Sequence, residues 1–162
     1  MNKDEILTLL RQKGIPFEYA GHRAVYNMEE MREVHLPHPE AEAKNLFVRD
    51  DKKRNYYLIT VRGEKRIDLK KFQSDQGTRR LSFASDDDLM SILGLTPGAV
   101  SPFGLLNDRE HRTVFYIDRE FTDADALIGV HPNENTATVW LKTSDLNHLL
   151  SEHGTTVRSF EI

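Results

Sequence analysis

The chain of 162 residues contains no cysteine. Disulfides, thiol nucleophiles and cysteine-ligated zinc sites are therefore excluded. The absence of disulfides agrees with a reducing compartment. Long hydrophobic runs are also missing, because the longest, such as residues 56–59 and 114–117, are only a few residues long. A membrane-spanning helix needs about 20 apolar residues, so we expect no membrane partner.

The N-terminus does not have the pattern of a signal peptide. Residues 1–5 read Met-Asn-Lys-Asp-Glu, which places two acids where a signal peptide has basic and then apolar residues. We therefore expect a cytoplasmic protein. The length suits one domain, and a chain of this size buries about 70% of its unfolded surface without disulfides. Residues 1–162 are expected to form that single domain.

Several common catalytic and cofactor-binding motifs are missing. The chain has no GxGxxG dinucleotide fingerprint, no GxxxxGK[ST] phosphate loop and no GxSxG nucleophile elbow around Ser101. His35 and His38 have a spacing that metal ligands use on a helix, but Pro37 and Pro39 interrupt any helix there. We expect no metal site and no cofactor.

Basic residues are unevenly distributed along a chain whose formal net charge is -4. Residues 49–80 hold eleven basic and five acidic residues, whereas residues 81–162 hold five basic and thirteen acidic ones. The overall charge argues against general binding of nucleic acid and against a DNA partner, because phosphate backbones are held by Lys and Arg. The basic segment is either a solvated hairpin or a local polyanion-binding face.

Capping residues and hydrophobic patterns predict an α+β fold. Helices are expected over residues 2–14, 27–36, 85–93 and 143–150, each opening on an Asn, Ser or Thr. Strands are expected at residues 16–19, 45–49, 55–61, 66–69, 80–84, 113–118, 126–130, 136–141 and 156–162. The polar turn at residues 50–54 joins two of these strands into a hairpin. We predict a mixed, largely antiparallel sheet with flanking helices.

Three segments contain candidate catalytic or binding residues. Lys44 stands immediately before an apolar strand, where its ammonium group either faces a cleft or is solvated. Glycine and proline in residues 97–104 impose an unusual backbone path, which is either a rigid turn or a nest of N–H groups for an oxyanion. Residues 128–135 bring one histidine, one proline and two asparagines to a strand end, as a polar cluster or an Asx turn.

In their order and spacing, these segments resemble the YbaK/ProX family, free-standing relatives of the prolyl-tRNA synthetase editing domain. The matching stretches are Lys44-Asn45-Leu46-Phe47, residues 95–103 and residues 129–135. The most similar group is the PrdX or ProX type, deacylases that act on Ala-tRNA(Pro). The resemblance covers most of the chain. It implies an editing-domain fold and hydrolysis, in trans, of the ester in mischarged Ala-tRNA(Pro), which maintains translational fidelity.

The resemblance also implies a set of site residues. Lys44 corresponds to the family's essential lysine and His131 to its pocket histidine, while Gly98 and Pro102 correspond to the ends of its GxxxP substrate loop. Lys44, Gly98 and His131 are the expected catalytic residues. Further substrate-binding residues, besides Pro102, are expected at Asn45, Ala99, Val100, Ser101, Asn133 and Asn135.

Hydrolysis of a labile ester needs a positioned water, a stabilised oxyanion and a grip on the terminal adenosine. We expect backbone N–H groups of residues 98–101 to polarise the carbonyl. Lys44 is expected to contact the terminal phosphate or ribose and not to act as a base, because an unperturbed lysine is protonated at neutral pH. His131 either orients the substrate or packs the pocket, and a ribose hydroxyl activates the water. Ala99 and Val100 are expected to form the wall of a pocket too small for proline.

The expected partner is the acceptor end of tRNA(Pro) charged with alanine, and prolyl-tRNA synthetase is a second candidate partner. Contacts to the tRNA are expected at Lys52, Lys53, Arg54, Lys65 and Arg66. Three alternatives stay open: a Cys-tRNA(Pro) deacylase of the YbaK type, a non-catalytic tRNA-binding or synthetase-associated module, and a small-molecule-binding protein.

Overall fold

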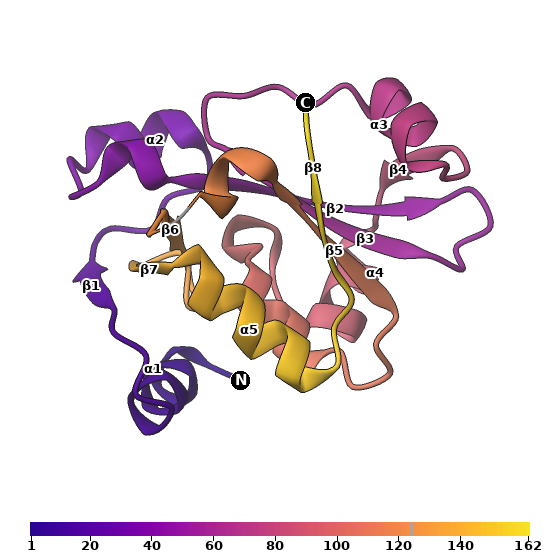
Figure 1. The fold of residues 1–162 in the computed structure, drawn as a ribbon. Helices are drawn as coiled ribbons and strands as arrows, with labels where there is room; N and C mark the ends of the chain where they lie inside the picture. Colours follow the sequence, from indigo (N-terminus) through magenta and orange to yellow (C-terminus); the bar gives the residue numbers. More distant parts are fainter. Residues whose placement is uncertain (124) are drawn as a thin grey trace.

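The computed structural model describes residues 1–123 and 125–162, which form two sheets and several helices (Figure 1). The helices are α1 (Lys3–Gln12), α2 (Met28–Glu33), α3 (Leu69–Gln76), α4 (Asp86–Asp88) and α5 (Thr143–His153). The strands are β1 (Glu18–Gly21), β2 (Ala43–Asp50), β3 (Tyr56–Arg62), β4 (Leu81–Phe83), β5 (Thr113–Asp118), β6 (Leu127–Val130), β7 (Ala137–Lys142) and β8 (Val157–Phe160).

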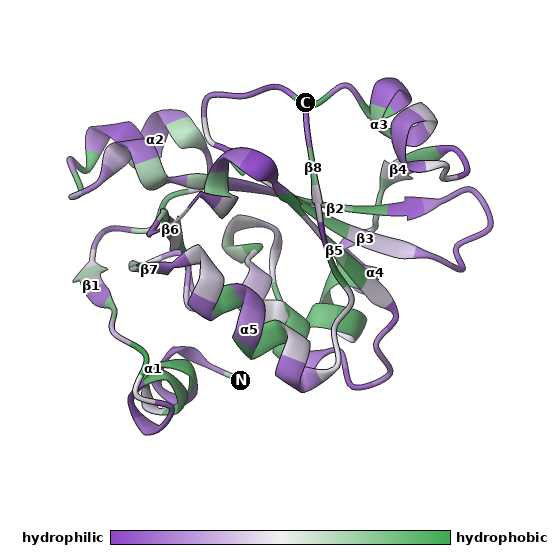
Figure 2. Cartoon of the chain, viewed as in Figure 1, coloured by the Kyte–Doolittle hydropathy of each residue, from purple (hydrophilic) through white to green (hydrophobic). Residues whose placement is uncertain are grey.

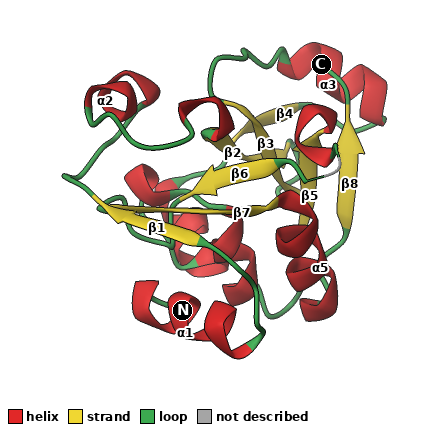
Figure 3. Cartoon of the chain, turned by 60° about the vertical axis from the view of Figure 1, so that its left-hand side comes forward, coloured by secondary structure: helices red, strands yellow, loops and turns green. Residues whose placement is uncertain are grey.

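The larger sheet has the order β4-β2-β3-β5-β8. Its β4, β2 and β3 are antiparallel neighbours, whereas β3, β5 and β8 run parallel. The smaller sheet, β1-β7-β6, is antiparallel, and its strands lie side by side in Figure 3. A single parallel bridge between Glu42 and Gly129 connects the start of β2 to β6. The predicted mixed, largely antiparallel α+β fold is confirmed.

Local chemistry explains the N-terminal helix. The Asn2 side chain accepts the Glu5 N–H at 2.9 Å, and the Glu5 carboxylate accepts the Asn2 N–H at 3.1 Å. This reciprocal capping box satisfies two backbone donors that a helix start otherwise leaves free. Ile6 and Leu10 are fully buried on the inner face of α1.

The predicted hairpin of β2 and β3 is confirmed, with Lys44 opposite Val61 in the register. Its turn is held by Asp50, whose carboxylate accepts the N–H groups of Arg54 and Asn55 at 2.9 and 3.3 Å. Such an Asx-type turn stabilises a loop that has no apolar contacts of its own. The hairpin therefore extends as a rigid arm from the start of β2 to an exposed tip.

The prediction of a strand at residues 66–69 is wrong. The Asp68 side chain accepts the N–H groups of Lys70 and Lys71 and begins α3 instead. One turn into this helix, Phe72 is buried against Tyr116 and Phe160 of the larger sheet. The preference of this short alternating segment for a strand is outweighed by the stability that the helix gains from its cap and from the burial of one aromatic ring.

The helix predicted from Ser85 is present but changes character along its length. Ser85 caps α4, and the chain continues as a π-helical turn over Leu89–Leu93. Gly94 then ends the helix in the left-handed conformation, with φ of +67°. This stop turns the chain into the glycine- and proline-containing loop.

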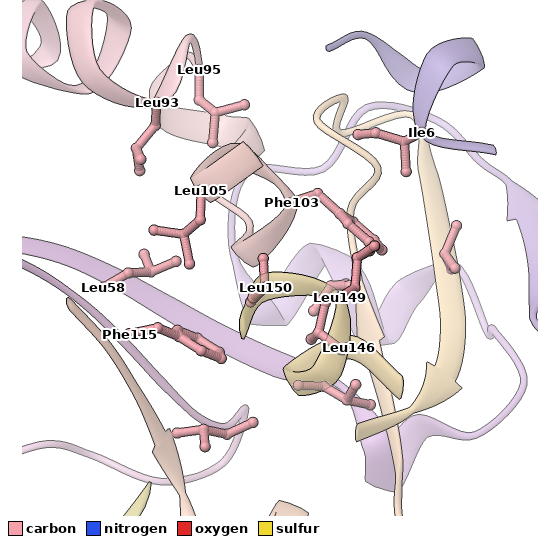
Figure 4. Packing of buried hydrophobic residues seen from close by; sticks show 14 of the residues in the cluster. Ile6, Leu58, Leu93, Leu95, Phe103, Leu105, Phe115, Leu146, Leu149 and Leu150 are labelled. Atoms are coloured by element: carbon pink, nitrogen blue, oxygen red, sulfur yellow. The ribbon is translucent and has the colours of Figure 1, made fainter. Parts of the chain in front are cut away.

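The main core lies between the larger sheet, α5 and the loop segments after residue 88. Leu58 and Phe115 from the sheet meet residues of α5 and of the 3₁₀ turn that follows Ser101 (Figure 4). A second cluster lies under α3 on the other face of the same sheet. Figure 2 shows hydrophilic residues on the outer helix surfaces and at the β2–β3 turn. In the part of the chain that the structure describes, no helix has the length and apolarity to span a membrane.

Candidate functional site

A cavity of about 270 Å³ opens where β2 begins, beside α2, the 3₁₀ turn Pro97–Ala99 and the end of β6. It gathers five of the residues predicted from the sequence, which come from three segments far apart in the chain. These five are Lys44, Asn45, Gly98, Val100 and His131. Such a meeting of polar groups in one hollow is typical of a binding or catalytic site.

Lys44 lies in β2 at the entrance of the hairpin and is partly exposed. It makes no ion pair with any residue that the structure describes. Its positive charge is therefore not neutralised by the protein and is available to an anionic group of a ligand.

Asn45 connects the hairpin to the loop. Its amide nitrogen donates to the Val100 carbonyl oxygen at 3.4 Å, and its oxygen accepts the Thr60 hydroxyl at 2.5 Å. Both ends of the amide are thus engaged within the protein. Asn45 positions the loop against β2, in addition to lining the cavity.

Gly98 forms part of the cavity wall, and the structure explains the absence of a side chain there. A Cβ atom at this position would lie 2.7 Å from Cδ1 of Tyr26 and 3.0 Å from Nδ2 of Asn135. These distances are too short for real Cβ contacts. Glycine thus lets the Tyr26 ring and Asn135 approach the loop backbone.

His131 is mostly buried, and its Nδ1 lies 2.8 Å from the Ala137 carbonyl oxygen. Because a carbonyl only accepts, Nδ1 carries the proton, and Nε2 of the neutral ring is left as an acceptor. Burial lowers the pKa of His131 from its ordinary value, with a further lowering by His22, against the opposing hydrogen bond to Ala137. The ring is therefore neutral near neutral pH.

Three predicted loop residues lie behind the cavity wall rather than on it. Ala99, Ser101 and Pro102 are all buried and do not line the cavity. The Ser101 hydroxyl donates to the His131 carbonyl oxygen at 2.5 Å, so it joins the loop to the histidine segment. The Ala99 N–H donates to the Thr96 carbonyl oxygen at 3.0 Å and is already used. Ala99 therefore forms neither the predicted wall nor an oxyanion donor.

The two predicted asparagines also have structural contacts. Nδ2 of Asn133 donates to the Met1 carbonyl oxygen at 2.9 Å, and Asn133 does not line the cavity. Nδ2 of Asn135 donates to the Val25 carbonyl oxygen at 2.9 Å, beside Gly98. Asn135 thus holds the segment before α2 in place, one layer behind the cavity.

The predicted tRNA-binding residues lie in two places. Lys52, Lys53 and Arg54 are exposed at the β2–β3 turn, about 25 Å along the strand from Lys44. Figure 1 shows this turn on the opposite side of the molecule from α2. It is therefore not part of the cavity rim.

Lys65 and Arg66 follow β3 on the cavity side of the hairpin. The Lys65 ammonium contacts the carboxylates of Asp118 at 2.7 Å and Glu120 at 2.8 Å. These two ion pairs offset its charge, so Lys65 is held by the protein. Arg66 is exposed.

Sequence reasoning missed Glu42, which also lines the cavity. Its side chain is only 8% exposed, and its Oε1 is fully buried with no hydrogen bond to any described residue. Burial raises the pKa of Glu42 to about 8, against a lowering effect of the nearby Trp140 indole N–H, and the charge of Glu40 adds a smaller raising effect. A glutamate two residues before a lysine gives no sequence signal of burial, because such side chains are ordinarily solvated.

Tyr26 was also missed. Its ring lies against Gly98 at the cavity and is 69% exposed, which is unusual for a large aromatic side chain. An exposed ring beside a lysine is a suitable surface for stacking of a nucleotide base.

The cavity offers no evident metal-binding group. Across residues 1–123 and 125–162, no three His, Asp or Glu side chains come together as ligands for an ion. Its chemical groups include the Lys44 side chain, one buried carboxyl group, one neutral imidazole and backbone donors.

Comparison with known proteins extends these observations. Residues 22–149 match the family described as the aminoacyl-tRNA editing domain. The prolyl-tRNA editing protein ProX of Acetoanaerobium sticklandii is 38% identical over 160 residues, which cover 99% of this chain and 97% of that protein. The prolyl-tRNA synthetase associated domain-containing protein 1 of Danio rerio is 31% identical over 163 residues, which cover 98% of this chain and 88% of the relative.

A solved structure has the same fold. The crystal structure of a candidate trans-editing enzyme for prolyl-tRNA synthetase superposes with a TM-score of 0.70, covering 99% of this chain and 96% of the other. At 18% sequence identity this likeness concerns the fold alone. The family match over residues 22–149 and the relative at 38% identity confirm the family resemblance derived from the three segments.

Proposed function

Since this chain belongs to the aminoacyl-tRNA editing domain family, we propose that it is a trans-editing deacylase that hydrolyses mischarged Ala-tRNA(Pro). The observation that carries the proposal is the meeting of Lys44, Gly98 and His131 in one cavity. Its substrate is the acceptor end of tRNA(Pro), and its reaction protects the reading of proline codons. Prolyl-tRNA synthetase is the enzyme that supplies the mischarged substrate.

The reaction adds water to the ester carbonyl and breaks the bond to the ribose oxygen. Lys44, whose charge is free among the described residues, contacts the terminal phosphate or ribose. Gly98 lies on the cavity wall, and its backbone N–H is the loop donor that stabilises the developing oxyanion. No cofactor is required in this scheme.

His131 holds the substrate as a hydrogen-bond acceptor. With Nδ1 donating to Ala137, its Nε2 accepts a hydrogen bond from a ribose hydroxyl and so orients the substrate. The low pKa of the buried ring keeps it neutral, which this role requires. The ribose hydroxyl then activates the water, in agreement with the expectation from the sequence.

A second site is needed because alanine is smaller than proline. A synthetic pocket that accepts proline discriminates against a lost methylene group by only about 1–3 kcal/mol. An editing cavity selects in the opposite direction, since it admits the small alanine side chain and excludes the larger proline ring. Val100, together with Met28 and Met31 of α2, supplies apolar surface for that exclusion.

The direct test measures deacylation of Ala-tRNA(Pro) by the wild type and by Lys44→Ala. Removing one charged contact to the reacting end is expected to lower the rate about 100-fold. Lys70→Ala is the matched control, because Lys70 is exposed on α3, outside the cavity. Equal rates for the wild type and Lys44→Ala would remove Lys44 from the mechanism.

Cys-tRNA(Pro) is the competing substrate, since cysteine is close to alanine in size. Measuring both charged tRNAs side by side decides between them, and we expect the alanyl ester to be hydrolysed faster. A non-catalytic tRNA-binding module would instead bind either tRNA with strong salt dependence and release no amino acid.

A further inference from the structure

Glu42 is a buried carboxyl group for which the scheme above has no use. It precedes β2, and its backbone carbonyl accepts the Gly63 N–H at 2.9 Å, so the main chain is fixed. Its side chain lines the cavity that holds Lys44 and also a second cavity of about 510 Å³ beyond Met28 and Met31. Glu42 thus borders both cavities.

The surroundings of Glu42 leave its hydrogen-bonding capacity unfilled. Oε1 of Glu42 and Nε1 of Trp140 are both buried; the indole N–H is close enough to lower the pKa of Glu42, but the two atoms do not have the geometry of a regular hydrogen bond. Both atoms lie over Gly129, since a Cβ atom there would be 3.3 Å from Oε1 and 2.7 Å from Nε1. Oε2, the other oxygen of this carboxyl group, is not fully buried, so it is the atom that a ligand in the cavity can reach as a hydrogen-bond donor.

The charges of the cavity indicate what that ligand group is. Among the described residues that line the cavity, Glu42 is the one acid and Lys44 the one permanently charged base, and the two do not pair with each other. Asn45 is engaged by Thr60 and Val100. The cavity therefore presents separate sites for an anion and for a cation.

An aminoacyl ester on a tRNA carries these two kinds of charge. Its phosphates are anionic, and its α-amino group is the one cation near the reacting carbon. We propose that Glu42 binds the α-ammonium group of the aminoacyl ester and so positions the carbonyl against the Gly98 loop. This assignment rests on the proposed function and adds to it the recognition of a free amino group.

The raised pKa of Glu42 is compatible with this role. In the empty cavity the carboxyl group holds a proton near neutral pH, and an α-amino group titrates at about 7.7–8.0. Because both groups are mostly protonated near neutral pH, formation of the carboxylate–ammonium pair releases the carboxyl proton to solvent. A hydrogen-bonded ion pair forms without a second charge being buried alone.

The experiment compares Ala-tRNA(Pro) with lactyl-tRNA(Pro), in which a hydroxyl group replaces the amine and the size is unchanged. Each enzymatic kcat/KM is divided by the uncatalysed hydrolysis rate of the same ester, because the amine itself activates the ester. For the wild type, we expect the normalised value to be about 10- to 100-fold higher for the alanyl ester. This comparison needs no variant, so it does not depend on folding of a mutant.

Glu42→Gln is the second arm, with Glu40→Gln as its matched control on the same segment. Glu42→Gln is expected to lower the alanyl value about 10- to 100-fold and to leave the lactyl value unchanged, whereas Glu40→Gln changes neither. Equal normalised values for the two esters in the wild type, or an equal loss for both in Glu42→Gln, would overturn the role of Glu42. A wild type inactive on Ala-tRNA(Pro) would instead overturn the proposed function, and this inference with it.

Discussion

Single residues in this cavity act through their surroundings as much as through their own chemistry. His131 is an acceptor because Ala137 takes its other nitrogen's proton, and Gly98 is a close neighbour of Tyr26 because it has no side chain. The motifs made Lys44, Gly98 and His131 predictable from the sequence. Glu42 was not predictable, because its burial depends on Trp140 and Gly129, which are distant in the chain.

Replacing Glu42 by glutamine is expected to change how stability depends on pH. The unfolded carboxyl group loses its proton near pH 4.5, whereas the folded one retains it up to about pH 8. Stability from this group is therefore complete below pH 4.5 and is lost as the pH rises toward 8 and above. Glutamine has no such loss, so Glu42→Gln should gain about 4 kcal/mol over the wild type between pH 5 and pH 8.5.

The measurement is urea unfolding of both proteins at several pH values. Glu40 raises the pKa of Glu42 and Trp140 lowers it, while Lys44 and His131 line the same cavity. These groups are common to both proteins, so the difference in unfolding free energy isolates Glu42. A difference that stays constant with pH would show that Glu42 titrates normally.

Gly98→Ala should impair catalysis more than it impairs folding. The new methyl group meets the Tyr26 ring at 2.7 Å, and this ring is exposed enough to move away. We expect the deacylation rate to fall at least tenfold, roughly, because the cavity wall and the backbone N–H of residue 98 shift. The free energy of unfolding should fall by about 1 kcal/mol or less.

A double variant separates this contact from general damage. In Tyr26→Ala/Gly98→Ala the clash with the ring is gone, so the double variant should recover the activity of Tyr26→Ala alone, which is the reference because the ring is also a surface for base stacking. Gly21→Ala is the control, because its added Cβ meets nothing closer than 3.6 Å. No recovery in the double variant would mean that Asn135, at 3.0 Å, or the loop itself is the obstacle.

At the scale of elements, the β2–β3 hairpin connects the cavity to the basic turn. Its strands were predicted well, because alternation and the polar turn are local signals. α3 was not predicted, because its sequence signals are weak: Asp68 is a single capping residue, and Phe72 is the buried residue that packs the helix on the sheet. The distance of the turn from Lys44 was also missed, because neighbours in sequence are far apart along an extended strand.

This geometry changes what the basic turn can do for binding. Charge reversal at Lys52, Lys53 and Arg54 is expected to raise the KM for full-length Ala-tRNA(Pro) several-fold at low salt and to leave kcat unchanged. An alanylated fragment of only the terminal nucleotides is too short to reach the turn, so its hydrolysis should not change. Steady-state kinetics on both substrates tests this prediction. An equal effect on the fragment would contradict a contact between the basic turn and the body of the tRNA.

The whole molecule combines an acidic body with a basic segment, in a chain of formal net charge -4. Much of the basic charge is already paired, as in Lys65 with Asp118 and Arg79 with Asp51. Binding to tRNA is therefore expected to be weak and transient, with its salt dependence set by few phosphate contacts. Such binding suits an enzyme that must release correctly charged tRNA.

The cavity is expected to select a small aminoacyl ester and to hydrolyse it. Single-turnover hydrolysis of Ala-tRNA(Pro) and Pro-tRNA(Pro) by the wild-type protein tests this most directly. We expect the protein to release alanine rapidly and to release proline no faster than buffer alone does. Hydrolysis of both esters at equal rates, or of neither, would contradict this expectation.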